Sequence, residues 1–400
     1  MKIEAPQAAA SIGRHRSTFL PFHFPHIGEE EVRAVEQTLR SGWITTGVKV
    51  QAFEDDFARF IGVKHAIAVS SATAGLHLAL EAIGVKTGDE VIVPTMTFAA
   101  SAEVVTYLGA TPVLVDCESD TLNMDPDEVE RAITPRTRAI MPVHFGGQPC
   151  DMDRIHEIAR QHDLRVVEDA AHSLPASYKG RPIGTLSDLT CFSFYATKTI
   201  TTGEGGMVTT NSDEYAERIR IMSLHGISRD AWKRYTAEGS WYYEILQPGY
   251  KYNLTDIAAA LGIEQLKRCT TFHENRSQIA ARYDRAFAGL SEVVPPVQRP
   301  DVMHAWHLYV IQLQLDSLTI SRSQFIDELK AEQIGSSVHF IPLHLHPYYR
   351  DRWGYQREDL PRASEVFERI VSLPIYPDMT DGDVDDVIRA VSAICADHRR

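Results

Sequence analysis

Between about residues 65 and 210, short apolar runs alternate with segments of helical spacing, and this rhythm constrains the fold more than any other feature. Runs rich in valine, isoleucine and phenylalanine occupy residues 66–70, 90–95, 111–116, 137–144, 165–171, 189–195 and 205–210. Helical patterns lie between most of them, at about 73–84, 99–108, 125–133 and 151–162. The alternation predicts an α/β fold with a mostly parallel, seven-stranded sheet covered by helices on both faces.

The rhythm changes after about residue 212. A long helix is predicted from Asp256 to about Ala286, and a proline-rich segment at 291–301 interrupts the pattern. We therefore expect an N-terminal extension at residues 1–18, a large domain at 19–290 and a smaller α+β domain at 291–400. Two strand-like stretches, at 307–315 and 337–341, are assigned to the smaller domain.

Charge and composition exclude several classes of protein. Lysine and arginine number 40 against 54 acidic residues, so the formal charge of −14 disfavours nucleic acid and anionic membranes as partners. No apolar run approaches membrane-spanning length, and the first eighteen residues lack the apolar core of a signal peptide. We expect a soluble, cytoplasmic protein. Its five cysteines form no close pair, which indicates neither a disulfide framework nor a zinc site.

A lysine follows one predicted strand, and an aspartate closes another. Lys198 lies between the 189–195 run and a glycine-rich turn at 201–206, and Asp169 ends the apolar part of 165–171. A pyridoxal phosphate (PLP) enzyme needs this pair. The amine forms an imine with the cofactor aldehyde, and the carboxylate keeps the pyridine nitrogen protonated so that the ring can accept electrons. The two residues alone favour an ordinary loop lysine and turn aspartate, because isolated motif matches are often fortuitous.

A candidate phosphate site follows the first predicted strand. Small residues in 70–78 open a helix, where a phosphate can approach the backbone amides and the positive end of the helix dipole. Ser71 and Thr73 offer hydroxyl donors, although either residue type is also an ordinary helix cap. Ser193, five residues before Lys198, is a second candidate phosphate donor or else a hydroxyl that bonds its own backbone.

Two ring-bearing residues also lie at predicted strand ends. Phe98 could stack on a flat cofactor, or it could belong to the core. His172 could donate to the phenolic oxygen of the cofactor, with Ala171 packed beneath the ring. The alternative for His172 is a surface histidine whose hydrogen bonds are satisfied elsewhere.

These segments resemble, in order and spacing, the DegT/DnrJ/EryC1/StrS sugar aminotransferases. The matching motifs are Ser70–Leu80, Thr97-Phe98, Pro142–His144, Glu168–His172, Phe192–Gly206, His225-Gly226, Gly249-Tyr250, Asp256–Ala259, and His339 with Pro342–His344. The resemblance extends from about Pro21 to the C-terminus. It implies a PLP-dependent transferase of fold type I, with a three-layer αβα large domain. It also implies a homodimer with shared active sites, and transfer of an amino group from glutamate to a nucleotide-linked keto sugar.

The resemblance also assigns roles by position. Lys198 forms the imine and moves the proton, Asp169 pairs with the pyridinium, and Phe98 stacks on the ring. His172 stands where the family uses glutamine or histidine near the ring oxygen. The phosphate ligands that it implies are Ala72, Thr73 and Ser193.

One motif departs from the commoner family pattern. The family sequence Gly-Tyr-Asn-Tyr-Arg, whose asparagine reaches the partner's phosphate, is replaced by Gly-Tyr-Lys-Tyr-Asn at 249–253. Either Lys251 or Asn253 could therefore make the contact with the partner's phosphate. The stretch Lys251–Ile257 resembles the subgroup that makes UDP-4-amino-4-deoxy-L-arabinose, which favours amination at C4 of a 4-keto sugar. Amination at C3 of a 3-keto sugar is the alternative, because both reactions use the same cofactor residues.

Two other functions fit the sequence less well. Relatives that dehydrate the sugar carry histidine at the lysine position, so Lys198 argues against that reaction. A non-catalytic sensor or interaction protein with a PLP fold would not need both Lys198 and Asp169.

The candidates for substrate binding are Trp43, Thr45 and Thr46, in a stretch where family members line the pocket, together with His339 and His344. An aromatic insert at 241–243 could hold the nucleotide. Buried hydrophobic or structural roles are the alternatives for these residues. We predict no metal site, because nothing near the histidines supplies the remaining ligands.

Overall fold

A single large sheet forms the centre of the protein in a computed structural model, which describes residues 16–228 and 242–400. Its strand order is β1-β9-β8-β5-β4-β2-β3. The strands are β1 (His65–Val69), β2 (Glu90–Pro94), β3 (Thr111–Val115), β4 (Thr137–Ile140), β5 (Arg165–Asp169), β8 (Leu189–Ser193) and β9 (Gly206–Thr210). Only β9 runs antiparallel to its neighbours, β1 and β8. The predicted seven strands and their mostly parallel arrangement are confirmed.

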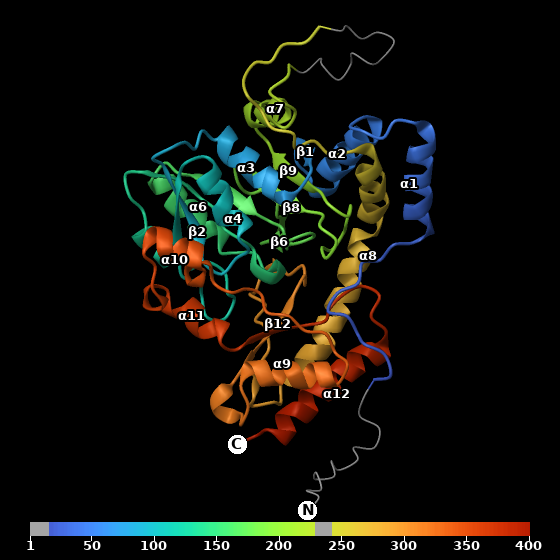
Figure 1. The fold of residues 1–400 in the computed structure, drawn as a ribbon, viewed down its shortest axis with the longest axis vertical. Helices are drawn as coiled ribbons and strands as arrows, with labels where there is room; N and C mark the ends of the chain where they lie inside the picture. Colours follow the sequence, from blue (N-terminus) through green and yellow to red (C-terminus); the bar gives the residue numbers. More distant parts are fainter. Residues whose placement is uncertain (1–15, 229–241) are drawn as a thin grey trace, which may run out of the picture.

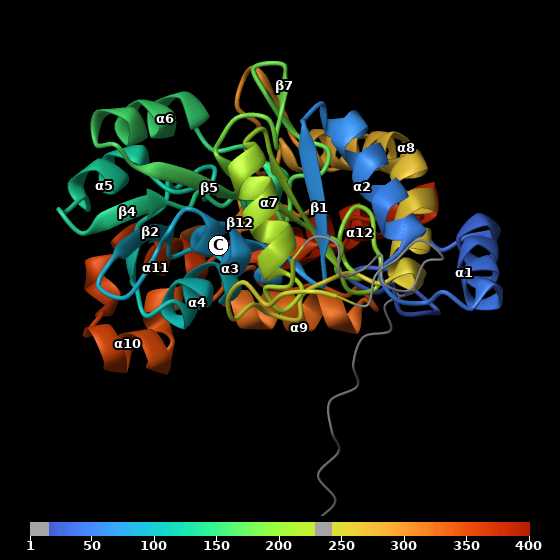
Figure 2. The ribbon, with the colours of Figure 1, turned by 90° about the horizontal axis from the view of Figure 1, so that it is seen from above.

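Helices cover both faces of this sheet, as Figure 2 shows from above. One face packs against α2 (Val48–Ile61), α6 (Met152–Gln161) and α8 (Asp256–Phe287), with α5 (Pro126–Arg131) beside α6. The other face packs against α3 (Ala72–Ala82), α4 (Ala100–Tyr107) and α7 (Asp213–Met222). The four predicted helices between the strands and the long helix after Asp256 are therefore confirmed within a few residues.

Side-chain caps explain where many of these helices begin. The side chains of five residues each accept a backbone N–H of the first helical turn: Ser71, Asp125, Asp151, Ser212 and Thr255. Each cap satisfies a donor that no helical carbonyl can reach. The loops at the strand ends therefore turn into helices at defined residues.

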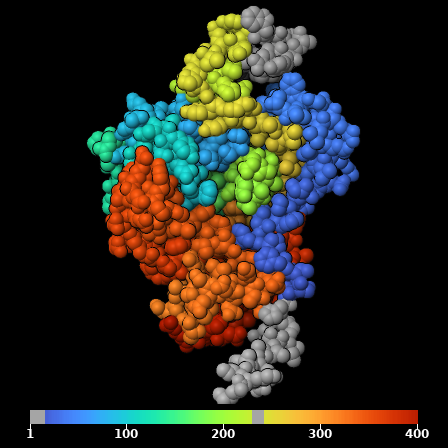
Figure 3. All heavy atoms as spheres, viewed as in Figure 1, coloured from blue at the N-terminus to red at the C-terminus, as the bar shows by residue number. Residues whose placement is uncertain are grey.

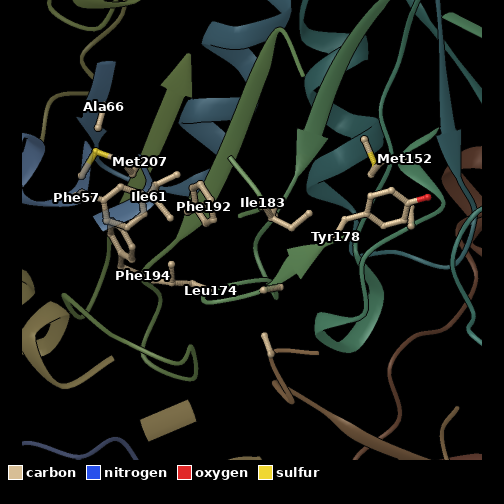
Figure 4. Packing of buried hydrophobic residues seen from close by; sticks show 14 of the residues in the cluster. Phe57, Ile61, Ala66, Met152, Leu174, Tyr178, Ile183, Phe192, Phe194 and Met207 are labelled. Carbon is tan, nitrogen blue, oxygen red and sulfur yellow. The ribbon is translucent and has the colours of Figure 1, made fainter. Parts of the chain in front are cut away.

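Successive side chains of β8 point to opposite faces of the sheet, so this strand contributes to the core on one face and to the helix α3 side on the other. Phe192 and Phe194 point toward the α2 face, where their rings lie 5.2 and 5.6 Å from that of Phe57 (Figure 4). Cys191 packs on the opposite face, with α3. Because side chains alternate along a strand, Ser193 falls on the α3 face as well.

The C-terminal part builds a second core around a three-stranded sheet of order β10-β12-β13. Its strands are β10 (Val293–Val294), β12 (Tyr309–Leu313) and β13 (Ile370–Leu373), and its helices are α9 (Arg322–Ala331) and α12 (Asp381–Asp397). Two further helices, α10 (Pro347–Trp353) and α11 (Pro361–Phe367), lie beside the large sheet. A small third sheet joins β6 (Ser177–Tyr178), β7 (Arg181–Pro182) and β11 (Val302–Met303). Figure 1 shows α8 extending from α2 down to α12, so this helix contacts both cores.

The two strands predicted in the C-terminal part have different outcomes. The one at 307–315 is confirmed as β12. The one at 337–341 is wrong, because Ser337 forms a single bridge with Ser372 before the chain leaves the sheet. The rings of His339 and Phe340 instead contact aromatic side chains from other segments.

The N-terminal segment lies against the C-terminal part. Leu20 bonds through its backbone to Gln333 and Gly335, and its side chain joins the second core. In the space-filling view the blue N-terminal residues contact the orange and red C-terminal ones (Figure 3). Helix α1 (Glu29–Ser41) follows this segment and packs on α8. The boundaries expected at residues 18 and 290 stay predictions, and residues 1–15 of the extension lie outside the described part.

In the described ranges, no helix combines the length and the apolar character that a membrane span requires. All five cysteines are buried and free.

Candidate active site

The predicted site residues gather at one edge of the large sheet. Strands β1, β2, β5 and β8 run in the same direction, so their carboxyl ends meet there, which is where open α/β sheets bind ligands. The segments that leave these ends carry Ser71 after β1, Phe98 after β2, Asp169 at the end of β5, and Ser193 and Lys198 at and after β8.

Lys198 lies in a tight turn after β8, where its backbone N–H donates to the carbonyl of Tyr195 at 2.9 Å. Burial lowers the pKa of the Lys198 amine to about 8, and the charge of nearby Asp169 opposes this shift. An amine with this pKa is readily deprotonated near neutral pH, as a nucleophile and a base must be.

The Asp169 carboxylate is buried and accepts two hydrogen bonds. Ser101 donates its hydroxyl to Oδ2 at 2.7 Å, and the backbone N–H of Ala171 donates to Oδ1 at 3.1 Å. Because the Ser101 hydrogen is used in this bond, Thr97 donates to Ser101 Oγ at 2.9 Å. Burial raises the pKa of Asp169, and the two donors oppose that rise. A further cationic donor, such as a pyridinium N–H, would therefore stabilise the charged carboxylate.

The start of α3 approaches the sheet closely. Ser71 caps the helix by accepting the N–H of Ala74 at 3.0 Å, so the cap interpretation of this serine is confirmed. The N–H groups of Ala72 and Thr73 belong to the first turn, where no helical carbonyl reaches them. A Cβ atom at Gly206 would lie 2.7 Å from the backbone nitrogen of Ala72, so only glycine permits β9 to begin here.

His172 presents a neutral ring beside the lysine. Its Nδ1 accepts the backbone N–H of Gly146 at 3.2 Å, which leaves the ring hydrogen on Nε2. Burial and the charge of Lys198 hold the pKa of His172 well below its usual range. A neutral ring with hydrogen on Nε2 can donate to an oxygen but carries no charge.

Phe98 is not a core residue. Its side chain is 64% exposed, and its nearest ring contact is Phe340, at 6.1 Å between centroids. An exposed aromatic ring at the edge of the site is free to stack on a flat ligand.

The tryptophan loop and the lysine–asparagine motif form one surface. The Trp43 indole donates to the carbonyl of Thr46 at 3.1 Å, and the Asn253 amide donates to Thr46 Oγ1 at 2.6 Å. The Lys251 ammonium donates to Asn253 Oδ1. The backbone of this motif lies beside the start of α3, because the N–H of Ser70 donates to the carbonyl of Tyr252 at 2.7 Å. The remaining predicted residue of this loop, Thr45, is exposed, and its carbonyl accepts the N–H of Asp256 at 3.1 Å.

The two predicted substrate histidines have different surroundings. His339 lies near Lys198, and burial together with the lysine charge lowers its pKa to about 4. Its Nδ1 bonds to Ser372 Oγ at 2.8 Å. The structure gives no support to the substrate role predicted for His344, because this residue is only 1% exposed and both ring nitrogens bond to buried hydroxyls, those of Thr95 and Ser364.

Several residues near the site were missed by sequence reasoning. Ser101 lies in an apolar helix pattern, three residues after Phe98, which is its one sequence signal. His307 packs its ring 4.3 Å from that of His172, and His23 lies close enough to Lys198 for the lysine charge to lower its pKa. No local pattern marks these two histidines. Trp241 of the aromatic insert lies outside the described residues.

The donor set fits PLP. It combines a buried amine at Lys198, a buried carboxylate at Asp169, open backbone amides at the start of α3 and an exposed ring at Phe98. Within residues 16–228 and 242–400, no cluster of three or more histidine, cysteine or acidic side chains could hold a metal ion.

Comparisons with known proteins give the same result. The sequence profile of the DegT/DnrJ/EryC1/StrS aminotransferase family matches residues 25–392. The spore coat polysaccharide biosynthesis protein SpsC of Bacillus subtilis is 52% identical over 95% of this chain and 98% of its own.

Solved structures agree in fold as well as in sequence. Spr1654 from Streptococcus pneumoniae, in its PLP form, is 38% identical with a TM-score of 0.89, over 95% of this chain and 99% of its own. DesV from S. venezuelae, in complex with a ketimine intermediate, is 37% identical with a TM-score of 0.84, over 92% and 94% of the two chains. The chain therefore belongs to the DegT/DnrJ/EryC1/StrS family and is a PLP-dependent sugar aminotransferase.

Proposed function

We propose that the protein transfers an amino group from L-glutamate to C4 of a nucleotide-linked 4-keto sugar, in the biosynthesis of an amino sugar. The observation that carries the transferase chemistry is the convergence of Lys198 and Asp169 at the carboxyl ends of β8 and β5. The preference for C4 rests on the Lys251–Ile257 motif, which resembles that of 4-aminotransferases. The similarity to SpsC supports a role in making a sugar for a polysaccharide.

Residues from four strand ends would hold the cofactor. Asp169 would bind the pyridine nitrogen, Phe98 would lie against the ring, and His172 would donate from Nε2 to the ring oxygen. The phosphate ligands that we propose are the hydroxyls of Ser71, Thr73 and Ser193 and the amides of Ala72 and Thr73. When bound, PLP supplies an aldehyde that carries the amino group and a ring that stores an electron pair.

Lys198 would act as the base that moves the proton. The Nζ atom is buried and has a pKa of about 8, so its neutral form is far more populated near neutral pH than that of an ordinary lysine. The same amine would first hold the cofactor and then, once displaced by the amino donor, take the proton from the donor carbon. The hydrogen bonds from Ser101 and Ala171 would favour the charged form of Asp169 against the effect of burial.

We propose further that the protein acts as a homodimer and that Lys251 reaches the cofactor phosphate of the partner subunit. Both ends of the Asn253 carboxamide are engaged within its own subunit, by Thr46 and Lys251. Lys251 is exposed and keeps two of its three ammonium hydrogens for an anion. Trp43, Thr45 and Thr46 form the adjoining surface, which we assign to the sugar nucleotide, and His339 is the candidate ligand for a sugar hydroxyl.

The test is turnover by PLP-loaded enzyme with glutamate and a panel of keto sugars. We expect an NDP-4-keto pentose or 6-deoxyhexose to give the 4-amino product and 2-oxoglutarate, identified by mass spectrometry and NMR. Free keto sugars should react far more slowly, because the diphosphate supplies binding energy that orients the keto carbon. Turnover of 3-keto nucleotides alone would overturn the C4 assignment. Equally efficient turnover of amino acids and keto acids alone would overturn the sugar assignment.

A further inference from the structure

We infer that His344 is a positioning residue for the cofactor site, because it holds the loop 95–101 that carries Phe98 and Ser101. This inference rests on the proposed function, which places Phe98 and Asp169 against PLP. His344 would hold this loop in place, whereas the sequence led us to expect a contact with the substrate.

The donor and the acceptor of each hydrogen bond around His344 follow from the neighbouring groups. Its backbone N–H donates to Thr95 Oγ1 at 3.3 Å, and the Thr95 hydroxyl in turn donates to Nδ1 of the ring at 2.8 Å. The hydroxyl of Ser364 donates to the carbonyl of Arg357 at 2.8 Å, so Ser364 Oγ must accept the Nε2–H of His344 at 2.9 Å. The imidazole is therefore neutral, with hydrogen on Nε2 and an acceptor at Nδ1.

The backbone reinforces this link. The carbonyl of Thr95 accepts the N–H of Leu343 at 2.9 Å and the N–H of Thr97 at 3.1 Å. Thr95 and His344 are both fully buried, so water cannot replace these bonds without opening the core. The end of β2 is thus tied to the segment before α10.

Further hydrogen bonds connect Thr95 to Asp169, the carboxylate that would bind the cofactor. Thr97 donates its hydroxyl to Ser101, and Ser101 donates to Asp169 at 2.7 Å. Thr97 and Ser101 are buried as well, so His344 lies at the far end of a continuous buried chain of polar groups that ends at Asp169.

The loop has no local cap to hold it. Helix α4 begins after Ala99, whose side chain cannot accept a hydrogen bond, whereas seven other helices in the described part of the chain begin at capping side chains. Phe98 is exposed and receives little support from neighbouring side chains. Met96 in the middle of the loop is buried in a core cluster, and the N–H of Thr95 donates to the carbonyl of Val115. The side-chain contacts of Thr95 with His344 and of Ser101 with Asp169 add to these anchors and fix the two ends of the loop.

Two variants of His344 separate positioning from simple packing. Asparagine can place its side-chain oxygen near the position of Nδ1 and accept from Thr95, whereas glutamine extends its amide toward Ser364 and leaves Thr95 unpaired. We expect His344→Gln to weaken PLP binding by about five- to tenfold and to shift the pH dependence of the bound-cofactor absorption, as the loss of one buried hydrogen bond requires. His344→Asn should retain most of the wild-type affinity and spectrum. His346→Gln, two residues later at a half-buried position, is the matched control.

A double-mutant cycle tests the path. If His344 acts through Ser101, the effects of His344→Gln and Ser101→Ala on the PLP dissociation constant will be less than additive. Equal effects of the glutamine and asparagine variants, additive effects with Ser101→Ala, or an unchanged spectrum in a folded His344→Gln enzyme would overturn the inference. Any of these outcomes is compatible with a wild-type enzyme that binds PLP and is active. Failure of the proposed function would appear in the wild-type enzyme itself, as the absence of a cofactor spectrum or of sugar turnover.

Discussion

Ser101 and Asp169 lie 68 positions apart in the chain, yet the serine hydroxyl donates to the buried aspartate at 2.7 Å. The bond joins the first turn of α4 to the end of β5. It stabilises a negative charge in a place where burial alone disfavours one. The strength with which Asp169 can hold a cationic ring nitrogen therefore depends on a residue from a different βα unit.

Replacing Ser101 with alanine should weaken the site without unfolding it. The variant removes one of the two donors to Asp169, so we expect PLP affinity to fall by about ten- to a hundredfold, as for a hydrogen bond to a charged group. The measurement is a titration of the apoenzyme with PLP. Ser173→Ala is the control, because Ser173 is also buried and its hydroxyl has no hydrogen-bond partner in the described part of the chain. Equal affinities in the two variants would contradict the role of Ser101.

Asp169→Asn should affect chemistry more than occupancy. The substitution keeps the shape of the side chain but removes the charge that stabilises a protonated ring nitrogen, so we expect the single-turnover rate with glutamate to fall by about 10²–10³-fold. Stopped-flow absorbance at saturating PLP measures this rate.

The neighbouring Glu168 provides the comparison. It is buried on the opposite face of the sheet, where it accepts hydrogen bonds from His144 and Thr190. Glu168→Gln should therefore lower the midpoint of thermal unfolding and leave the single-turnover rate within a few-fold of wild type. If the single-turnover rate falls equally in both variants, Asp169 has no special role in the chemistry.

Subunit mixing tests the assignment of Lys251. If it completes the phosphate site of the partner, chains with Lys198→Ala and chains with Lys251→Ala are each impaired alone, but their heterodimer contains one site with both native residues. Mixing should then restore up to about a quarter of wild-type activity, from half the molecules with one of two sites. Asn253→Ala, mixed in the same way, is the comparison. No recovery in chains shown to exchange subunits would mean that each subunit builds its own site.

Buried neutral histidines predict that stability falls in mild acid. His304 and His344 each accept a hydrogen bond at Nδ1, and burial lowers their pKa values to about 3 and about 4. The unfolded chain binds these protons at higher pH than the native protein, so stability is complete above about pH 6.5 and declines as the pH falls below it.

We expect each of the two imidazoles to cost about 1 kcal/mol of unfolding free energy between pH 7 and pH 5.5. Urea unfolding at the two pH values, at constant PLP, measures the change. The His344→Gln variant should lose about half of the dependence that these two residues create, and His346→Gln should lose none. An unfolding free energy that is the same at both pH values would contradict the prediction.

The elements that could be predicted from the sequence are those with local causes. Apolar runs such as 90–95 and 189–195 are strands because they are buried on both faces. Asp169 and Lys198 could be placed because Asp169 ends one such strand and Lys198 lies in the loop after another. The stretch 337–341 has the composition of a strand, but only Ser337 finds a partner. Strand pairing is a property of two segments, so one segment alone could not show this.

Residues that act through distant contacts could not be predicted in this way. Ser101 reads as a polar residue in an apolar helix, and its meaning comes only from Asp169. His307 lies two residues before β12, and its ring packs on that of His172. His344 belongs to a family motif, but the motif alone did not show that both of its ring nitrogens form hydrogen bonds within the core.

The assignment of Lys198 as the residue that binds the cofactor covalently is the most direct point to test. Borohydride reduction of the PLP-loaded enzyme should fix one phosphopyridoxyl group per chain, and peptide mass spectrometry should find it on Lys198. The Lys198→Ala enzyme should still bind PLP through its phosphate and ring contacts, but it should carry no fixed label and show no turnover. A label on another lysine of the wild-type enzyme, or full activity in Lys198→Ala, would contradict the central claim.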